Sequence, residues 1–342
     1  MTLVTPPAPP RSPWQRLYAA AHARRRRRAA RHAARLPRPV VSVGNLHWGG
    51  TGKTPVVAAL AAHLRDAGRR VAILSRGYRG SAREPLLVSR GDGPLAGPDV
   101  AGDEPAELAA RLPGVAIAVG RSRHDAGELA LATLTPPPDL FLLDDAFSHV
   151  ALARDLDLLV LPAADPFGGG RLPPGGRLRE PLASSRHAHA LLLTGADATP
   201  EQAAAIGAAL AASGFSGAAF AAPTVAAPAH AVAGEPLAPG SPVLLVAGIA
   251  NPARFLAAAR AQELAIHGTL LFGDHHRYRP GDLRHLERAF AASGARHLLT
   301  TGKDLVKLRP LTRLPLALLP VAAAPEPAFW PWLADRLAAL SR

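Results

Sequence analysis

The pattern of hydrophobic and polar positions divides the chain into short apolar runs that alternate with longer amphipathic stretches. Residues 39–45 form an apolar run that ends in a glycine turn, and residues 54–68 repeat apolar positions at helical spacing up to Gly68. Apolar runs without polar alternation are typical of strands that are buried on both faces of a parallel sheet. The pattern therefore predicts strands at 39–45 and 70–77 with a helix at 54–68 between them.

The alternation continues to about residue 216. Helices are expected in DEPAELAARLPG and SRHDAGELALATL, and strands in VAIAVG, DLFLLDDA, LDLLVLPA and AHALLLTG. Residues 217–240 are rich in alanine and proline without clear periodicity, which indicates a connection between domains. A second series of strands and helices follows in residues 241–342 and closes with an amphipathic helix. A length of 342 residues is consistent with two domains that each bury their own core.

The N-terminal segment carries a concentrated positive charge. The net charge is +13, and Arg24 to Arg28 form an unbroken basic run just after Trp14, Leu17 and Tyr18. Such a surplus predicts an anionic partner, namely a nucleic acid, a phosphorylated substrate or a membrane surface. Each arginine near an anionic bilayer contributes about 1 kcal/mol, so we expect a helix that associates with a membrane surface. A solvated basic arm is the plainer alternative.

Two absences narrow the function classes. The chain has no cysteine, which excludes disulfides, thiolate catalysis and metals held by cysteine. No apolar run approaches the ~20 residues that a spanning helix needs, and no signal peptide is evident. We expect a protein that does not cross a membrane.

The stretch GGTGKTP, residues 49–55, predicts a phosphate loop between a strand and a helix. The strict Walker pattern fails, because His47 stands where the first glycine is expected. The physical requirements are met all the same: a glycine-rich loop lets backbone amides converge on phosphate oxygens, Lys53 can reach the terminal phosphates, and the Thr54 hydroxyl suits Mg²⁺. Only three of the 39 basic residues are lysines, so Lys53 is unlike a generic surface cation. The residues expected to contact the nucleotide phosphates in this loop are Gly49, Gly50, Thr51, Gly52, Lys53 and Thr54.

The predicted fold is therefore α/β, with a P-loop NTPase-like parallel-sheet domain and a smaller second α/β domain. The expected segments are a basic N-terminal membrane-associating helix (1–38), the P-loop catalytic domain (39–216), a linker (217–240) and a C-terminal α/β domain (241–342).

Further polar residues follow predicted strands. Asp144 and Asp145 end one strand, as the Mg²⁺-associated aspartates of P-loop enzymes do, although two helix-capping aspartates are an alternative. Asp103 and Glu104 precede a helix, where capping explains one of them equally well. GRLREP supplies Arg177, Arg179 and Glu180 in a loop suited to phosphate and metal contacts, on a weak signal from composition.

Two motifs resemble those of other enzymes without matching them. FGDHHRY holds two adjacent histidines, yet the upstream metal motifs of Asp-His-His phosphoesterases are missing, and solvated loop histidines are as good an explanation. TTGKDLVKL places Lys303 directly beside Asp304, whereas the guanine-reading pattern of GTPases is Lys-x-Asp. A GTPase is therefore disfavoured.

The ordered set of motifs closely resembles the tetraacyldisaccharide 4′-kinase family, the lipid A 4′-kinases. The matching stretches run from about residue 38 to 308: PVVSVGNLHWGGTGKTP, LSRGYRG, GDEP, VGRSR, LLDDAFSHVALARDLDLLVL, FGGGRLPPGGRLREPL, AGIANPARF, DHHRY and TTGKDLVKL. The family's own loop also lacks the first Walker glycine.

This resemblance implies an ATP-dependent kinase that phosphorylates the 4′-hydroxyl of a tetraacylated glucosamine disaccharide 1-phosphate in lipopolysaccharide assembly. It implies two α/β domains with a short β-linked hinge, ATP and Mg²⁺ as cofactors, and a peripheral location at the cytoplasmic face of the bacterial inner membrane. The expected partners are the acylated disaccharide and an anionic membrane surface, without nucleic acid and without an obligate protein partner.

The resemblance also implies roles for single residues. Asp103 would take the hydroxyl proton with His275 in support, and Lys53 would act on the ATP phosphates as a third catalytic residue. Arg179 would contact ATP. The expected metal ligands are Thr54, Asp144, Asp145 and Glu180. Asp103 and His275 fall in different expected domains, so their pairing would require domain closure.

Three positions depart from the family pattern. Ala146 replaces a glycine, Ser148 replaces a glutamine, and Gly302 replaces a glutamate. If the glycine had a positive φ, Ala146 would cost about 1 kcal/mol.

Three other classes stay open: a metal-insertion ATPase, which normally needs Cys or His ligands; a nucleic-acid-binding ATPase, which should show stacking aromatics along a basic groove; and a membrane-docking protein that only binds nucleotide.

Overall fold

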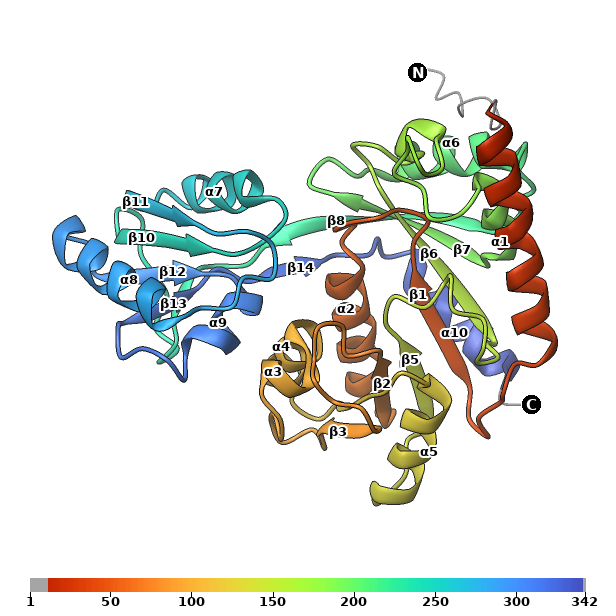
Figure 1. The fold of residues 1–342 in the computed structure, drawn as a ribbon, viewed down its shortest axis with the longest axis horizontal. Coiled ribbons are helices and arrows are strands. Elements are labelled where there is room, and N and C mark those ends of the chain that lie inside the picture. The colour runs from red at the N-terminus through yellow and green to blue at the C-terminus, as the bar shows by residue number, and fades with distance from the viewer. Residues whose placement is uncertain (1–11, 341–342) are drawn as a thin grey trace.

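The computed structural model describes residues 12–340 and consists of two lobes, each built on its own sheet (Figure 1). The larger sheet has nine strands in the order β14-β8-β7-β6-β1-β5-β2-β4-β3. Its inner strands are parallel, and the edge strands β3 and β14 are antiparallel to their neighbours. The strands are β1 (Val40–Gly44), β2 (Val71–Ser75), β3 (Leu86–Ser89), β4 (Ala116–Val119), β5 (Leu140–Leu143), β6 (Leu156–Pro162), β7 (Ala190–Gly195), β8 (Ala218–Ala226) and β14 (Val321–Ala323).

Helices bury both faces of this sheet, which explains why its strands lack polar alternation. One face packs against α2 (Lys53–Asp66), α4 (Asp103–Arg111) and α10 (Phe329–Leu340). The other face packs against α5 (Arg123–Thr133) and α6 (Pro200–Ala211). The short helices α3 (Pro98–Ala101), η1 (Gly168–Gly170) and η2 (Leu182–His187) lie in connecting segments.

The smaller lobe holds a five-stranded sheet in the order β11-β10-β12-β13-β9. Its strands are β9 (His230–Ala231), β10 (Pro242–Ala247), β11 (Ala265–Leu271), β12 (His297–Thr300) and β13 (Leu316–Leu318). One face packs against α7 (Pro252–Ala261), and the other packs against α8 (Pro280–Ser293) and α9 (Gly302–Leu308). The predicted α/β class, with a large parallel-sheet domain and a smaller α/β domain, is confirmed.

The domain limits differ from the expected ones. The expected linker, residues 217–240, contains β8, which is a full strand of the larger sheet. The expected C-terminal domain, residues 241–342, loses its end to the larger lobe, because β14 pairs with β8 and α10 packs on the larger sheet. The smaller lobe is thus inserted between β8 and β14, which cross together between the lobes (Figure 1). The apolar face of α10 required burial, and the aromatic ring of Phe220 in β8 meets Phe329 there.

The expected basic helix is present as α1 (Pro13–Arg31) along one side of the larger lobe (Figure 1). Residues 1–11 of the expected N-terminal segment lie outside the described residues. Among the described helices, none combines the length and the apolar character that crossing a membrane requires.

Candidate active site

The phosphate loop joins the carboxyl end of β1 to α2. In the sheet, β1 lies between β5 and β6, at a topological switch point of the kind where ligands bind in open α/β sheets. Gly49 and Gly52 have φ values of 108° and 80°, which suit glycine alone. Asn45 Nδ2 donates to Thr51 Oγ1 at 2.7 Å, and Thr194 Oγ1 donates to the Thr51 carbonyl oxygen at 2.6 Å. A Cβ at Gly49 would meet nothing within 4 Å. The loop is thus held by polar contacts at Thr51 and open at its glycine-rich crest, where backbone amides can face phosphate oxygens.

Asp145 lies between the loop and a second basic group. The Lys53 Nζ is 3.6 Å from Asp145 Oδ1, and the Arg179 guanidinium donates to both carboxylate oxygens at 3.1 Å. Arg179 also donates to Asn45 Oδ1 at 2.7 Å. Burial alone would raise the pKa of Asp145, but Lys53 and Arg179 hold that pKa below its usual value. Thr54 is buried in the first turn of α2, beside Lys53. The expected phosphate-contacting residues therefore gather at one edge of the sheet.

The carboxylate of Asp144, at the same edge of the sheet, has no hydrogen-bond partner. Its side chain is 1% exposed, and neither carboxylate oxygen has a hydrogen-bond partner. Burial, together with Glu104 and Asp145, raises the pKa of Asp144 to about 7. Two orphaned carboxylate oxygens beside a phosphate loop are the ligands that Mg²⁺ prefers, so Asp144 and its neighbour Asp145 fit this metal. Within residues 12–340, no cluster of three or more acidic or histidine side chains has the spacing of a complete protein-made metal site.

The contacts of Glu180 differ from those of the two aspartates. Its side chain is fully buried, and Oε2 is 3.2 Å from Arg26 Nη1 of α1. Arg26 Nη1 also donates to the Phe147 carbonyl oxygen at 2.7 Å. One oxygen, Oε1, lacks a partner. The expectation that Glu180 ligates the metal stays a prediction: Arg26 pairs with Oε2, and Oε1 is left without a partner.

The structure brings Asp103 and His275 together, although 172 residues separate them. Asp103 is the first residue of α4, and His275 Nδ1 is 3.0 Å from Asp103 Oδ2. His275 has a φ of 58°, a left-handed conformation that is uncommon outside glycine and that concentrates at functional sites. The Tyr78 ring packs edge-on against the imidazole at 5.8 Å between centroids. The residue expected to accept the proton and the residue expected to support it are thus in contact between the two lobes.

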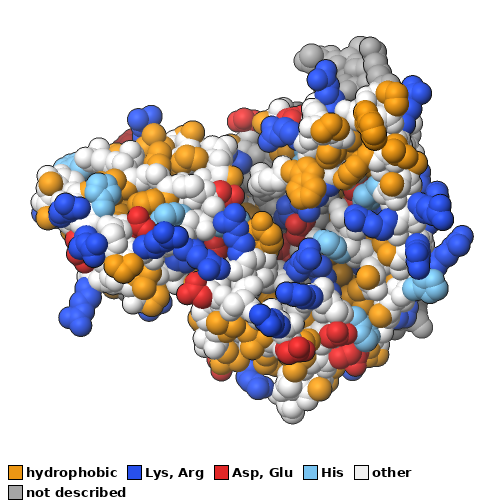
Figure 2. Space-filling view, viewed as in Figure 1, with side chains coloured by type: hydrophobic (Ala, Val, Ile, Leu, Met, Phe, Trp, Pro, Cys, Tyr) orange, Lys and Arg blue, Asp and Glu red, His pale blue; other side chains and the backbone are white. Residues whose placement is uncertain are grey.

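Figure 2 shows a depression between the lobes, with basic and acidic side chains gathered around it. Hydrogen bonds from arginine side chains to backbone carbonyl oxygens join the lobes. Arg79 Nη1 lies 3.2 Å from the Asp274 carbonyl oxygen, and Arg277 Nη2 donates to the Arg79 carbonyl oxygen at 2.9 Å. Like His275, Arg79 has a left-handed backbone, with a φ of 63°.

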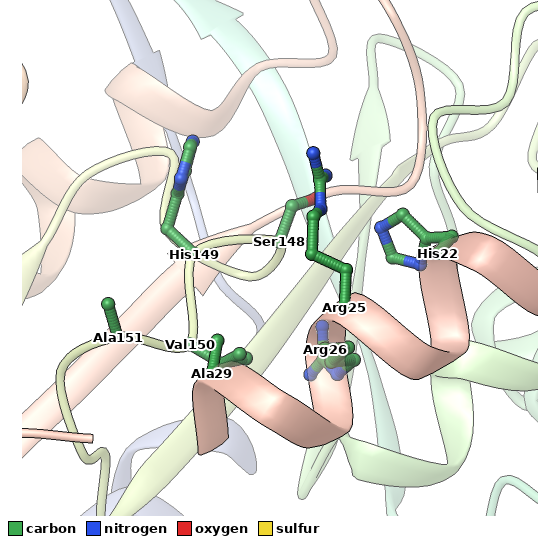
Figure 3. Close-up of a pocket in the computed structure, with 8 residues that line it drawn as sticks. All are labelled: His22, Arg25, Arg26, Ala29, Ser148, His149, Val150 and Ala151. Atoms are coloured by element: carbon green, nitrogen blue, oxygen red, sulfur yellow. The ribbon is translucent and has the colours of Figure 1, made fainter. Parts of the chain in front are cut away.

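A cavity of about 190 Å³ lies between α1 and the loop after β5 (Figure 3). Arg25 reaches into this region from α1, and Ser148 and His149 face it from the loop, three and four residues after Asp145. The Ser148 hydroxyl has no partner. Burial, together with Arg123, lowers the pKa of His149 to about 4. The lining residues are His22, Arg25, Arg26, Ala29, Ser148, His149, Val150 and Ala151.

Two of the three departures have a structural explanation. The residue with a positive φ in the Asp-Asp-Ala turn is Asp145, at 46°, and Ala146 is fully buried without such a conformation. The anticipated strain at Ala146 is therefore absent. A Cβ at Gly302 would come within 2.6 Å of Glu107 Oε1, so the Glu107 carboxylate occupies the place of a side chain at position 302. Ser148 lines the cavity beside α1, and nothing in the structure explains why it replaces a glutamine.

Sequence reasoning missed several residues of this site. Asn45, Arg123 and Lys307 stood inside motifs that were recognised, yet they received no role. Arg123 is buried and donates to the Asp144 carbonyl oxygen at 2.9 Å. Lys307 Nζ is 3.2 Å from Asp103 Oδ2. The scarcity of lysine in the chain is a signal that points to Lys307 as well as to Lys53.

Comparisons with known proteins agree with this geometry. The profile of the family described as "Tetraacyldisaccharide-1-P 4'-kinase" (LpxK) matches residues 11–338. The chain is 45% identical to the tetraacyldisaccharide 4′-kinase of Anaeromyxobacter dehalogenans (strain 2CP-C) over 81% of this chain and 74% of that protein. It is 40% identical to the tetraacyldisaccharide 4′-kinase of Geobacter metallireducens over 82% and 81% of the two chains.

A solved structure shares the whole architecture. It is the crystal structure of LpxK from Aquifex aeolicus in complex with ATP, which superposes with a TM-score of 0.73 at 29% sequence identity, over 95% of this chain and 97% of that one. The predicted resemblance is confirmed, and the chain belongs to the tetraacyldisaccharide 4′-kinase family.

Proposed function

We propose that this protein transfers the γ-phosphate of ATP to the 4′-hydroxyl of an acylated glucosamine disaccharide 1-phosphate, the lipid A precursor named by its family. The observation that carries the proposal is the pairing of Asp103 with His275 across the lobes, next to Glu104, which interacts electrostatically with Lys53 of the phosphate loop. A nucleotide-hydrolysing ATPase needs a positioned water, whereas a kinase needs a base that a hydroxyl acceptor can reach.

The catalytic roles follow from the contacts. Lys53 and the amides of residues 49–54 stabilise the charge of the ATP phosphates, and Arg179 contributes a second cation there. Asp103 accepts the proton of the sugar hydroxyl, and His275 orients the Asp103 carboxylate. Docking of the smaller lobe excludes water from the phosphates.

Thr54, Asp144 and Asp145 would hold a Mg²⁺ ion with ATP. That ion supplies charge neutralisation at the transferred phosphate when bound. The orphaned oxygens of Asp144 support this assignment.

The cationic cavity between α1 and the loop 148–151 suits the phosphorylated, sugar end of the acceptor, since Arg25 and Arg26 line it and the Ser148 hydroxyl has no protein partner (Figure 3). Trp14 and Leu17 are 72% and 61% exposed on the same helix.

The outward face of α1 also supports membrane association. Tyr18, His22 and Arg26, spaced four residues apart, face the larger lobe. Other basic residues line a second depression on the helix: Arg24, Arg27, Arg28, Arg31 and His32. A helix with an exposed cationic stripe and exposed large apolar side chains, here Trp14 and Leu17, is suited to lie on anionic lipid. We place the protein at the cytoplasmic face of the bacterial inner membrane, as a peripheral protein.

A transfer assay tests the proposal. The purified protein is incubated in detergent micelles with γ-labelled ATP, Mg²⁺ and tetraacyldisaccharide 1-phosphate, beside Asp103→Asn. The matched control is Asp99→Asn. Asp99 is an acidic residue of α3 whose contacts lie away from the phosphate loop. Label in the lipid with wild type and Asp99→Asn, and its loss in Asp103→Asn, supports the kinase. ATP hydrolysis by the wild type without labelled lipid contradicts the acceptor.

A further inference from the structure

The contact between α4 and α9 places two acidic residues against two lysines across the lobe boundary. α4 begins with Asp103 and Glu104, and α9 carries Lys303 and Lys307 one turn apart. Lys303 Nζ is 2.5 Å from Glu104 Oε1, and Lys307 Nζ is 3.2 Å from Asp103 Oδ2. Two of the three lysines in the chain therefore bind the residue proposed as general base and its neighbour.

Lys307 is held in place before any substrate binds. Its side chain is 7% exposed, and Nζ lies 3.1 Å from Asp304 Oδ1 and 3.2 Å from the His276 carbonyl oxygen. With Asp103 Oδ2, three oxygens surround the ammonium group: the His276 carbonyl oxygen accepts a hydrogen bond, and the two carboxylate oxygens lie within ion-pair distance. Asp304 is itself fixed, because it accepts from the Gly248 backbone N–H at 2.8 Å and the Thr301 hydroxyl at 2.9 Å.

Two side chains of the smaller lobe contact the same carboxylate oxygen of Asp103. His275 Nδ1 and Lys307 Nζ both contact Oδ2, with Asp304 and the Tyr278 ring behind Lys307. Oδ1 stays free of both contacts and can face a hydroxyl. Burial alone would raise the pKa of Asp103, but the His275 hydrogen bond and the Lys307 charge hold that pKa below its usual value.

We propose that Lys307 is a positioning residue for the reaction: it keeps Asp103 ionised and oriented, so that the general base is complete only when α9 of the smaller lobe is docked on α4. This inference rests on the proposed function, in which Asp103 accepts the hydroxyl proton. The Lys303–Glu104 pair fixes the same docking one turn away.

A purely structural role explains the arrangement less well. A buried ion pair adds little stability, because desolvation offsets its attraction, and this chain uses arginine for nearly all other positive charge. A compact ammonium fits among three converging oxygens, whereas the planar fork of arginine favours paired acceptors. The site therefore selects lysine for its geometry.

The test compares wild type with Lys307→Met combined with Asp304→Asn, which removes the cation without leaving Asp304 as an unpaired buried charge. Asp304→Asn alone is the matched control, and Lys307→Arg restores the charge. The double variant is expected to lose about 10- to 100-fold in kcat with little change in the KM for ATP. The acid limb of its pH profile is expected to move to higher pH by about 1. Lys307→Arg is expected to keep the acid limb of wild type.

A second readout needs no acceptor. The NMR signal of the His275 ring, in contact with Asp103, follows the titration of that carboxylate, and the titration is expected at higher pH in the double variant. An unchanged titration overturns the inference even if the lipid is not the acceptor. An equal loss of kcat at every pH, with an unchanged titration, also overturns it and leaves Lys307 a structural residue. Failure of wild type to label the lipid, together with a shifted titration, rejects the acceptor and keeps the role of Lys307.

Discussion

The phosphate loop and the Asp103–His275 pair are built in opposite ways. The loop is contiguous: residues 45–54 follow one strand, open one helix and take their shape from two glycines with positive φ. The pair joins residues 172 positions apart, and His275 reaches Asp103 only because the smaller lobe lies against α4. The loop can therefore bind nucleotide in a single lobe, whereas proton transfer depends on how two lobes sit together.

The largest effect is expected in the contiguous region. Lys53→Met removes a cation that lies next to the phosphates and pairs with Asp145, and it should lower kcat/KM by about 100- to 1,000-fold. Nucleotide affinity should fall as well, because the lysine acts on ATP itself. Equilibrium binding of a fluorescent ATP analogue to the isolated variant measures this. An unchanged affinity would mean that the loop amides alone hold the nucleotide.

The assembled pair should respond differently. Asp103→Asn and His275→Gln should each lower kcat by about 100-fold, and the double variant should lose hardly more than Asp103→Asn, because the two residues act as one unit. ATP affinity should stay near that of wild type in all three. The four kcat values of this cycle, measured by label transfer, test the coupling. Additive losses would show that His275 has a task of its own.

The same contrast explains what the sequence could predict. The loop and the Asp144–Asp145 turn were recognisable, since the residues that mark each of them are contiguous and directly follow a buried strand. The return of β14 and α10 to the larger lobe was missed. An apolar pattern indicates that an element is buried, but it does not indicate which of the two sheets the element packs against. The ion pair of Glu180 with Arg26 was missed for the same reason: nothing local links residue 180 to a helix that begins 167 positions earlier, at Pro13.

A smaller effect is expected where α4 and α9 touch. Gly302→Glu places a carboxylate against Glu107, which already fills that space. Crowding and like charge should cost about 1–2 kcal/mol at this contact, so kcat should fall by up to about tenfold through weaker docking of the lobes. Adding Glu107→Ala should restore most of the activity. If the double variant is as slow as Gly302→Glu alone, the space near Glu107 is not what limits position 302.

The smallest effect is a dependence of stability on pH at the same contact. Burial raises the pKa of Glu107, and Lys303 and Arg111 offset this only in part. The folded state therefore binds more protons than the unfolded state between the ordinary pKa of glutamate and the raised one, so stability falls as the pH rises through that window and stays lower above it. Glu107→Gln keeps the shape and removes the ionisation. Its Tm should exceed that of wild type at pH 8, by an amount equivalent to about 1 kcal/mol or less, and the difference should vanish near pH 4. If the variant is instead less stable at pH 8, the Glu107 carboxylate holds the lobes together through Lys303. The contact between α4 and α9 would then depend on three acidic residues of α4, namely Asp103, Glu104 and Glu107, instead of two.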